Sequence, residues 1–210
     1  MNRNMLQFEI ARDLQANLDK YRKAGKIIGF VPTMGALHQG HLELVKRSKE
    51  ECDITVVSIF VNPTQFNNSA DLKKYPRTIE EDLSKLRAYD VEFVFHPSEK
   101  EIYPKDKEIR SDFDFEGLDE VMEGKFRPGH FAGVAQVVNR LLEIVGPDRI
   151  FMGQKDFQQV AIIRKMLAQT EHKAELVMCP TIREPHGLAM SSRNVRLSAS
   201  SREKAACIFE

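Results

Sequence analysis

Two histidines stand where a buried strand gives way to a helix. The stretch GFVPTMGALHQGHLELVKRS, residues 29–48, begins as an apolar strand and ends with the apolar spacing of an amphipathic helix. Between the two, Gly35 and Gly40 let the backbone approach a ligand closely, and the helix start presents free N–H groups that attract phosphate. His38 and His41 share one helical turn and face the same way, and a bound polyanion would favour their charged forms. The junction therefore predicts a phosphate-binding site.

Two other interpretations fit this loop when it is considered alone. The first is a capped helix with one histidine packed and the other solvated. The second is a metal site, but two histidines are too few for one, and no HExxH-like carboxylate accompanies them. The sequence also lacks the GxxxxGK[ST] pattern of a Walker loop. The rest of the chain has to decide between these interpretations.

The elements that must position the histidines alternate between strand and helix. Because this alternation is typical of an open parallel sheet with right-handed crossovers, it predicts an α/β fold. In such sheets ligands bind beyond the carboxyl ends of the strands, so the loops that follow strands are the places to inspect. These loops are PTMGALHQGH, NPTQFNN, HPSEKEIYP, GQKD and REPHGLAMSSRN. The expected strands are 26–31, 54–61, 91–95, 149–153 and 174–179, and the expected helices are 8–24 (ended by Gly25), 41–51, 78–89, 133–145 and 156–169.

Composition places the chain among ordinary globular proteins. Its 210 residues suffice for one large domain, and 42% are hydrophobic and 30% charged. Lysine plus arginine equals aspartate plus glutamate, at 31 each, which argues against a nucleic-acid or membrane partner engaged through net charge. The sequence contains no stretch suited to a signal peptide or a membrane span. Cys52, Cys179 and Cys207 form no CxxC and are predicted to be reduced core thiols of a cytoplasmic protein.

Several motifs together resemble one family. HQGH has the HxGH form of the nucleotidyltransferase superfamily, and the longer string PTMGALHQGH resembles the pantoate–β-alanine ligase (pantothenate synthetase) family. VNPTQF, YPRT, GKFRPGHFAGV, FMGQKDFQQ and MSSRN resemble further motifs of that family, in its order, between about residues 29 and 196. The resemblance implies a Rossmann-like domain over residues 1–181, with helices on both faces of the sheet. Residues 182–210 would then hold the MSSR loop and the beginning of a small C-terminal domain.

The resemblance also implies an activity. Such enzymes join (R)-pantoate to β-alanine at the expense of ATP, by way of a pantoyl adenylate, and release pyrophosphate and AMP. Mg²⁺ would mainly screen the triphosphate, since it takes few ligands from proteins. The family is usually homodimeric, and its partners here would be the small-molecule substrates alone.

For ATP, the resemblance implies a set of residues drawn from three loops. His41 and His38 would donate to the departing pyrophosphate, and Lys155 would bridge the phosphate and the attacking carboxylate. Backbone near Ile182 would receive the adenine. The full set is Pro32, Thr33, Met34, Gly35, Ala36, Leu37, His38, Gln39, Gly40, His41, Gly153, Gln154, Lys155, Asp156, Ile182, Met190, Ser191, Ser192 and Arg193.

Two members of this set have structural alternatives. Lys155 could be a solvated lysine that opens a helix, although the positive end of the helix dipole disfavours a cation there. The MSSRN segment could be a polar turn. As a functional segment, its Ser191, Ser192 and Arg193 offer two hydroxyls and a guanidinium suited to clamping phosphate.

For the acid and the amine, the resemblance implies Gln65 and Gln159 as pantoate ligands, with Gln65 also close to β-alanine. A neutral amide can orient a carboxylate without quenching its nucleophilicity. Asn62 is placed near the ribose or the acyl group. Arg127 and His130 lie in a loop with Pro and Gly between them, and would approach β-alanine or the phosphates, unless the loop is purely structural.

Asp82, in YPRTIEEDL, is the candidate magnesium ligand, with an exposed helical acid as its alternative. Three other classes of protein are alternatives. Adenylyl- and cytidylyltransferases usually show a late SSTxIR-like loop and lack the paired glutamines, and a fragment that charges tRNA would carry a basic surface. A nucleotide-binding module without catalysis would bind ATP without coupling to pantoate.

Members of the family are longer than this chain and carry a second, smaller domain that closes over the site. The chain ends at SSREKAACIFE, within what resembles the first helix of that domain. Without the lid the adenylate would be less protected from water and the MSSR segment poorly anchored. We therefore expect the 210-residue chain to keep its fold and some ATP binding, with turnover well below that of a longer chain. Steady-state pantothenate formation by the two chains tests this, and equal rates would contradict it.

Overall fold

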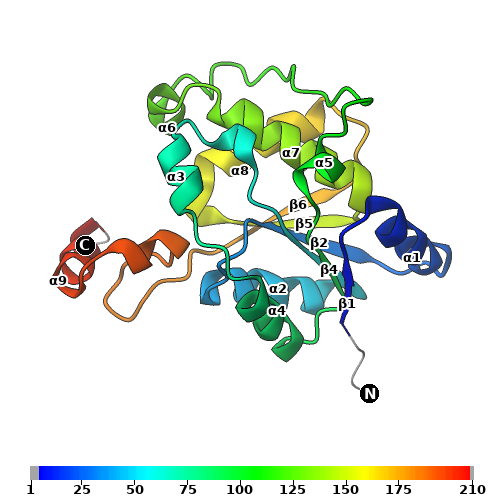
Figure 1. Ribbon diagram of the computed structural model, residues 1–210, viewed down its shortest axis with the longest axis horizontal. Helices are drawn as coiled ribbons and strands as arrows, with labels where there is room; N and C mark the ends of the chain where they lie inside the picture. Colours follow the sequence, from blue (N-terminus) through cyan, green and yellow to red (C-terminus); the bar gives the residue numbers. More distant parts are fainter. Residues whose placement is uncertain (1–4, 209–210) are drawn as a thin grey trace.

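The computed structural model describes residues 5–208, and its centre is a parallel sheet (Figure 1). Within that range six strands pair in the order β1-β4-β3-β2-β5-β6, every neighbouring pair being parallel. The predicted α/β fold with an open parallel sheet is therefore confirmed. The strands are β1 (Leu6–Phe8), β2 (Ile28–Thr33), β3 (Ile54–Ile59), β4 (Phe93–Phe95), β5 (Arg149–Gly153) and β6 (Glu175–Cys179).

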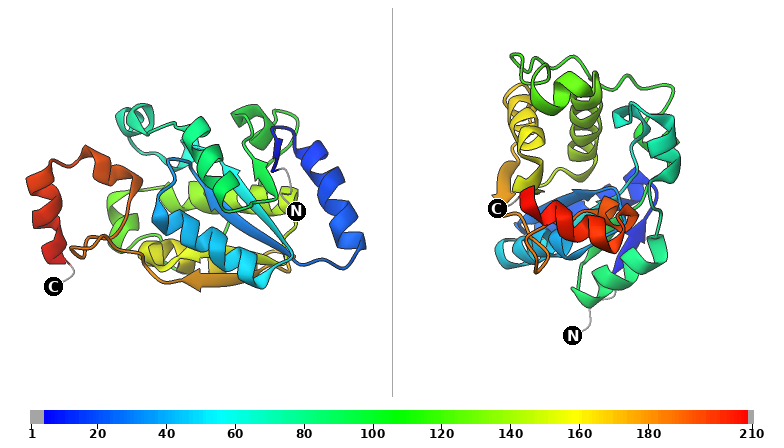
Figure 2. Two further views of the ribbon diagram at one scale, coloured as in Figure 1. Left: turned by 90° about the horizontal axis from the view of Figure 1, so that it is seen from below. Right: turned by 90° about the vertical axis from the view of Figure 1, so that its left-hand side faces the viewer.

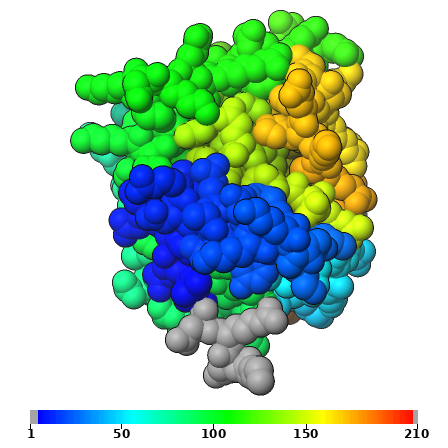
Figure 3. All heavy atoms as spheres, turned by 90° about the vertical axis from the view of Figure 1, so that its right-hand side faces the viewer, coloured from blue at the N-terminus to red at the C-terminus, as the bar shows by residue number. Residues whose placement is uncertain are grey.

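Helices cover both faces of the sheet, as Figures 1 and 2 show. One layer holds α1 (Ala11–Lys23), α7 (His130–Val145) and α8 (Phe157–Ala168), and the other holds α2 (Gln39–Glu51) and α4 (Ile79–Ala88). Figure 3 shows the side of the first layer on which α1 lies against α7. Shorter helices are α3 (Ser69–Lys74), α5 (Glu99–Ile102), α6 (Met122–Phe126) and α9 (Ala199–Lys204), with 3-10 turns at Pro63–Gln65, Gln154–Asp156, Ser192–Arg196 and Ala205–Ile208.

Burial on both faces explains why the central strands are almost continuously apolar. Successive side chains of a strand point to opposite faces, and here both faces meet a helix layer. In β2, Phe30 packs into the core beneath α1, α7 and α8, whereas its neighbour Val31 packs into the core beneath α2 and α4. Val56 and Val57 in β3 divide in the same way.

The first helix differs from its prediction at its start and agrees at its end. A helix was expected from residue 8, but Phe8 belongs to β1, and Ile10 is the extended N-cap with 45% of its surface exposed. A strand of three residues is too short to show a two-residue period, so the sequence pattern missed it. Gly25 has a φ of +69°, the left-handed conformation expected of a glycine that follows a helix end.

The three cysteines are free, and Cys207 differs from its predicted core position. Cys179 is buried and Cys52 is half-buried, but Cys207 is exposed near the end of the described chain. Among the helices of residues 5–208, none is long and apolar enough to cross a membrane. The proposed boundary between residues 181 and 182 stays a prediction, and residues 1–4 and 209–210 of its two parts lie outside the described range.

The strand order creates a switch point between β2 and β5. From β2 the chain adds β3 and β4 on one side, and it then returns to add β5 and β6 on the other. The loops that leave β2 and β5 therefore diverge at the carboxyl edge, which is where open α/β sheets bind ligands. These are the loops that carry the two histidines and Lys155.

A close contact fixes the 3-10 turn Pro63–Gln65 against α7. A Cβ atom built on Gly133 would lie 2.5 Å from the carbonyl oxygen of Thr64, so only glycine permits this approach. Gly133→Ala is expected to lower the free energy of unfolding. Overpacking costs about 1–3 kcal/mol, and the better helix propensity of alanine offsets ~1 kcal/mol of this.

Thermal unfolding followed by circular dichroism measures this difference. Gly153→Ala is the matched control for stability, because an added Cβ there meets no atom within 4 Å. If the two variants melted together, the close approach of α7 to the turn would be wrong.

Candidate active site

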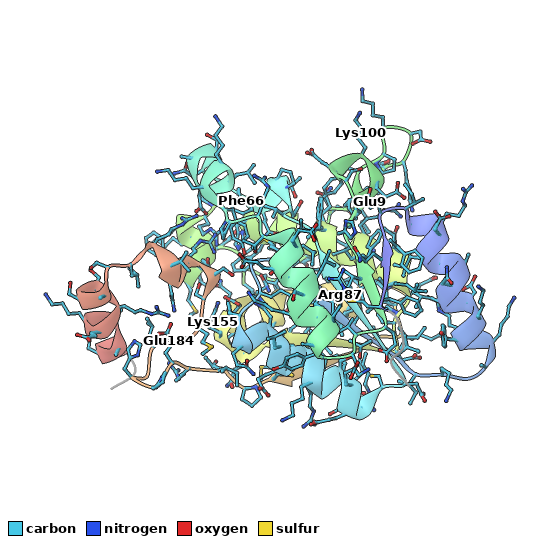
Figure 4. All side chains as sticks on the ribbon, turned by 60° about the horizontal axis from the view of Figure 1, so that its bottom comes forward. Glu9, Phe66, Arg87, Lys100, Lys155 and Glu184 are labelled. Atoms are coloured by element: carbon cyan, nitrogen blue, oxygen red, sulfur yellow. The ribbon has the colours of Figure 1, made fainter. Side chains whose placement is uncertain are left out.

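A cavity of about 250 Å³ lies where the loops after β2, β3 and β5 meet the segment after β6. In Figure 4, Lys155 lies between the body of the sheet and the C-terminal segment, and Phe66 lies on the other side of the same cavity. The predicted site residues that line it are Pro32, Thr33, Met34, His38, Gly40, His41, Asn62, Gln65, Arg127, His130, Gly153, Lys155, Asp156, Gln159, Ile182, Met190, Ser191, Ser192 and Arg193. Those outside its lining are Gly35, Ala36, Leu37, Gln39, Gln154 and Asp82.

The two histidines cap the helix that follows them. His38 is the N-cap of α2, and its Nδ1 accepts a hydrogen bond from the Gly40 N–H at 3.1 Å. The Nδ1 of His41 accepts from the His38 N–H at 3.3 Å, and the two rings lie 4.1 Å apart. Since a backbone N–H can only donate, neither Nδ1 carries a proton. Each neutral ring therefore keeps its proton on Nε2 and can donate from that atom.

Burial and nearby lysines keep both rings neutral. Burial lowers the pKa of His38 to about 4, and the charges of Lys155 and Lys85 add to the effect. The pKa of His41 falls to about 3, by burial first and then by its neighbours His38, Lys155 and Lys85. The expectation of charged rings thus applies only when a polyanion is bound. The helix is capped, as the structural alternative supposed, but both rings are half-buried and neither is solvated.

Lys155 sits at the start of a helix, as predicted. It follows β5 in the 3-10 turn Gln154–Asp156, directly before α8, and 36% of its side chain is exposed. Its Nζ lies 3.5 Å from the Asp156 carboxylate. Lys155 and both histidines line the same cavity, and the charge of Lys155 helps to lower the pKa of both rings.

The MSSRN segment is anchored to the body of the protein at the cavity, so the expectation that it would be poorly anchored is wrong. Ser192 Oγ donates to the Ala36 carbonyl at 3.1 Å, which links the segment to the loop after β2. Arg193 and Arg196 contact the Asp71 carboxylate of α3 at 2.9 and 2.8 Å. Hydrogen bonds from Arg196 and then Arg193 hold the pKa of Asp71 below its usual range. Arg193 also lies over the ring of Tyr75, 5.4 Å from its centre.

Asp82 is neither the exposed acid nor the metal ligand that the sequence suggested. Its side chain is fully buried, and its two oxygens accept from the backbone N–H groups of Ala36 (2.8 Å) and Leu37 (2.7 Å). Thr78 Oγ1 donates to it at 3.2 Å. Asp82 therefore holds the loop after β2, where Ala36 has a φ of +50°. Within residues 5–208 no cluster of three or more His, Cys, Asp or Glu side chains is placed to hold a metal ion.

Arg127 and His130 both hold the backbone of Gln65. His130 Nδ1 lies 2.8 Å from the Gln65 carbonyl, and since that oxygen can only accept, the proton is on Nδ1 and Nε2 is an acceptor. Burial lowers the pKa of His130, which favours this neutral form. Arg127 donates to the same carbonyl at 3.3 Å and pairs with Glu123. The loop thus has a structural role, while both side chains also line the cavity.

Sequence reasoning missed Tyr75, which lines the cavity, and Asp71, which pairs with Arg193 of the MSSRN segment and with Arg196. Tyr75 lines the cavity and is 5% exposed. It belongs to the YPRT motif, so the motif was a signal for it. Asp71 had no such signal, because its partners Arg193 and Arg196 lie more than a hundred residues away in the sequence.

Acidification is expected to destabilise the ligand-free protein through the two histidine caps. An unfolded histidine has a pKa of 6.5, so between pH 6.5 and the folded values of about 4 and 3 the unfolded chain binds more protons. The stability that the neutral caps contribute is complete above pH 6.5 and is lost as the pH falls toward those values.

A His38→Asn, His41→Asn double variant isolates this effect, because asparagine also caps helices and does not titrate. Its difference in melting temperature from the unaltered protein should change steadily between pH 6.5 and 4, in favour of the variant as the pH falls. A difference that is independent of pH would contradict the assignment of neutral rings.

Comparison with known proteins agrees with this geometry. The family model of pantoate-beta-alanine ligase matches residues 7–210. Pantothenate synthetases of Bacteroides thetaiotaomicron and Flavobacterium psychrophilum are 56% and 50% identical, covering 92% and 98% of this chain and 68% and 73% of their own lengths.

Solved structures agree as well. A pantoate-beta-alanine ligase from Francisella tularensis, complexed with beta-gamma ATP and beta-alanine, superposes with a TM-score of 0.91 at 42% identity, over 98% of this chain and 78% of that one. A pantothenate synthetase from Thermus thermophilus gives 0.90 at 41% identity, over 98% and 72%. The match of the family model over nearly the whole chain, together with these identities, means that the chain belongs to the pantoate–β-alanine ligase family.

Proposed function

We propose that this protein condenses (R)-pantoate with β-alanine, using ATP, to give pantothenate, AMP and pyrophosphate. The observation that carries the proposal is the convergence of three loops on one cavity at the switch point of the sheet. These loops bring a pair of Nε2–H donors, the Lys155 cation and the Gln65 amide into a single space. Membership of the family supports the same reaction.

The chemistry needs activation before amide formation, because a carboxylate is a poor acyl donor. An oxygen of pantoate attacks the α-phosphorus of ATP, the bond to the β,γ-pyrophosphate breaks, and pantoyl adenylate forms. The amine of β-alanine then attacks the acyl carbon, loses its proton and displaces AMP. For the first step, in-line positioning and stabilisation of developing negative charge supply the rate, and little covalent help is required of the protein.

The histidines and Lys155 suit the first step. His38 and His41, neutral with their protons on Nε2, would donate hydrogen bonds to the departing pyrophosphate rather than transfer a proton to it. Lys155 would bridge the α-phosphate and the attacking carboxylate. A charged side chain at the mouth of the cavity has little desolvation to overcome, which favours this role for a half-exposed lysine.

The remaining ATP contacts would come from backbone and from the MSSRN segment. Main chain near Ile182 would take the adenine, and Ser191, Ser192 and Arg193 would clamp phosphate. Arg193 would exchange its Asp71 partner for phosphate oxygens when ATP binds. The guanidinium fork fits both anions, so the exchange conserves the number of charge-assisted hydrogen bonds.

The acid and the amine would occupy the wall formed by Gln65, Gln159 and His130. Gln65 and Gln159 would bind pantoate. His130 Nε2, as an acceptor, matches the ammonium group of β-alanine, and Arg127 matches its carboxylate. This arrangement would place the amine beside the acyl carbon on the far side from the phosphates.

Mg²⁺, the oligomeric state and the cellular location are proposals of the same kind. We propose that Mg²⁺ arrives with ATP and is bound by phosphate oxygens, since both oxygens of Asp82 are engaged by the protein. A cytoplasmic homodimer fits the family resemblance, and the free thiols of Cys52, Cys179 and Cys207 fit a reducing compartment.

Substitution of Lys155 tests the proposed function. Lys155→Met removes a cation aimed at the transition state, so kcat/KM should fall by roughly 10²–10³-fold. Lys165→Met, on the same stretch of chain but paired with Glu116 outside the cavity, is the matched control and should behave as the unaltered protein.

The measurement is AMP release with each substrate omitted in turn, and it should require ATP, pantoate and β-alanine together. Calorimetric titration with ATP in the presence and absence of pantoate adds a second test, because only the ligase predicts coupled binding. AMP release without pantoate, or equal rates for the two lysine variants, would refute the proposal.

A further inference from the structure

The loop HPSEKEIYP, which follows β4, contains a tyrosine that lies behind the cavity wall. Tyr103 follows α5 and is not among the residues that line the cavity. Its hydroxyl donates to Asn62 Oδ1 at 2.8 Å, and its ring packs 6.4 Å from that of Phe60. Burial raises the pKa of Tyr103, so its hydroxyl stays protonated at neutral pH.

Two backbone groups of unambiguous polarity show which way the Asn62 amide is turned. Its Nδ2 lies 3.1 Å from the carbonyl oxygen of Gly133, which can only accept a hydrogen bond. Its Oδ1 accepts from the backbone N–H of Thr64 at 3.4 Å and from Thr64 Oγ1 at 3.1 Å. The Tyr103 hydroxyl is the nearest donor to that oxygen. With 1% of its surface exposed, Asn62 is occupied by the protein itself.

The orientation of the Asn62 amide determines that of the Gln65 amide. Asn62 Nδ2 donates to Gln65 Oε1 at 3.2 Å, so the oxygen of the Gln65 amide faces Asn62. The Gln65 Nε2 lies 3.1 Å from the Met34 sulfur, and both residues line the cavity. A thioether is a weak acceptor, and Nε2 has two hydrogens. Gln65 therefore presents N–H donors to a ligand.

We propose that Tyr103 is a positioning residue which, through Asn62, holds the Gln65 amide as a donor to an acceptor oxygen of the acid substrate. This inference rests on the proposed function and sharpens it. The carboxylate and hydroxyl oxygens of pantoate accept hydrogen bonds, whereas the ammonium of β-alanine can only donate. Gln65 thus donates to the acid, and Asn62 acts on Gln65 instead of on the ribose or the acyl group.

Two single substitutions test the contacts that run from Tyr103 through Asn62 to Gln65. Asn62→Asp replaces the Nδ2 donor with an oxygen, which can only accept a hydrogen bond. The Gln65 amide should therefore flip, so that its Nε2 donates to this oxygen and its Oε1 points into the cavity. The KM for pantoate should rise about tenfold or more. Tyr103→Phe removes one donor to Asn62 Oδ1, and the KM for pantoate should rise about fivefold. The KM values for ATP and β-alanine should stay within about twofold.

Tyr21→Phe is the matched control, because it removes a tyrosine hydroxyl from α1, against Phe93 in the core and away from the cavity. A purely structural role for Tyr103 would lower the melting temperature and affect the KM of every substrate alike. That result, or an unchanged pantoate KM in both variants, would overturn the inference.

A measurement without turnover separates this inference from the proposed function. In protein labelled with ¹⁵N at glutamine side chains, the Gln65 amide is identified by its loss in Gln65→Ala. Pantoate should shift this resonance in the unaltered protein, and the shift should weaken in Tyr103→Phe. A pantoate-bound protein with an unmoved Gln65 amide would overturn the inference even if AMP release were normal. Absent AMP release with a shifted amide would overturn the proposed function alone. If Asn62→Asp fails to fold, Tyr103→Phe and this titration decide.

Discussion

The buried carboxylate of Asp82 is the interaction on which the site depends. A loop that leaves a strand and must present backbone to a ligand leaves its own N–H groups without partners, and each such group costs free energy if buried. Asp82 accepts from two of them, at Ala36 and Leu37, and so fixes a loop that contains a residue with positive φ. The histidines begin directly after this fixed loop, so their position follows from it.

Contacts within the protein determine which histidine nitrogens of the cavity are hydrogen-bond donors and which are acceptors. Backbone N–H groups occupy the Nδ1 atoms of His38 and His41, which leaves those rings as donors. A backbone carbonyl occupies Nδ1 of His130, which leaves that ring as an acceptor. Of these three histidines, two thus present donors and one presents an acceptor, and the difference comes from the main-chain group that each Nδ1 contacts. Preorganisation of this kind avoids reorganising dipoles as charge develops.

The alternation of strands and helices could be predicted from the sequence because the period of apolar residues reports burial directly. The loops of the site could be predicted because motif residues are contiguous: PTMGALHQGH and GQKD lie at the carboxyl ends of β2 and β5 as expected. What could not be predicted were partners distant along the chain. Asp82 has the sequence context of an exposed helical acid, and only the three-dimensional structure brings it to Ala36. Asn62 lies directly after a strand, where substrate-binding residues are expected, but its amide is hydrogen-bonded to Tyr103 and Gly133.

The pairing of Arg193 and Arg196 with Asp71 has an effect on which anions the empty protein attracts. Two guanidinium groups at the entrance of a cavity would create a strong positive potential and collect chloride, sulfate or inorganic phosphate. With a carboxylate between them, much of that field is cancelled at a distance. The carboxylate of Asp71 thereby weakens the attraction of the two guanidinium groups for small anions.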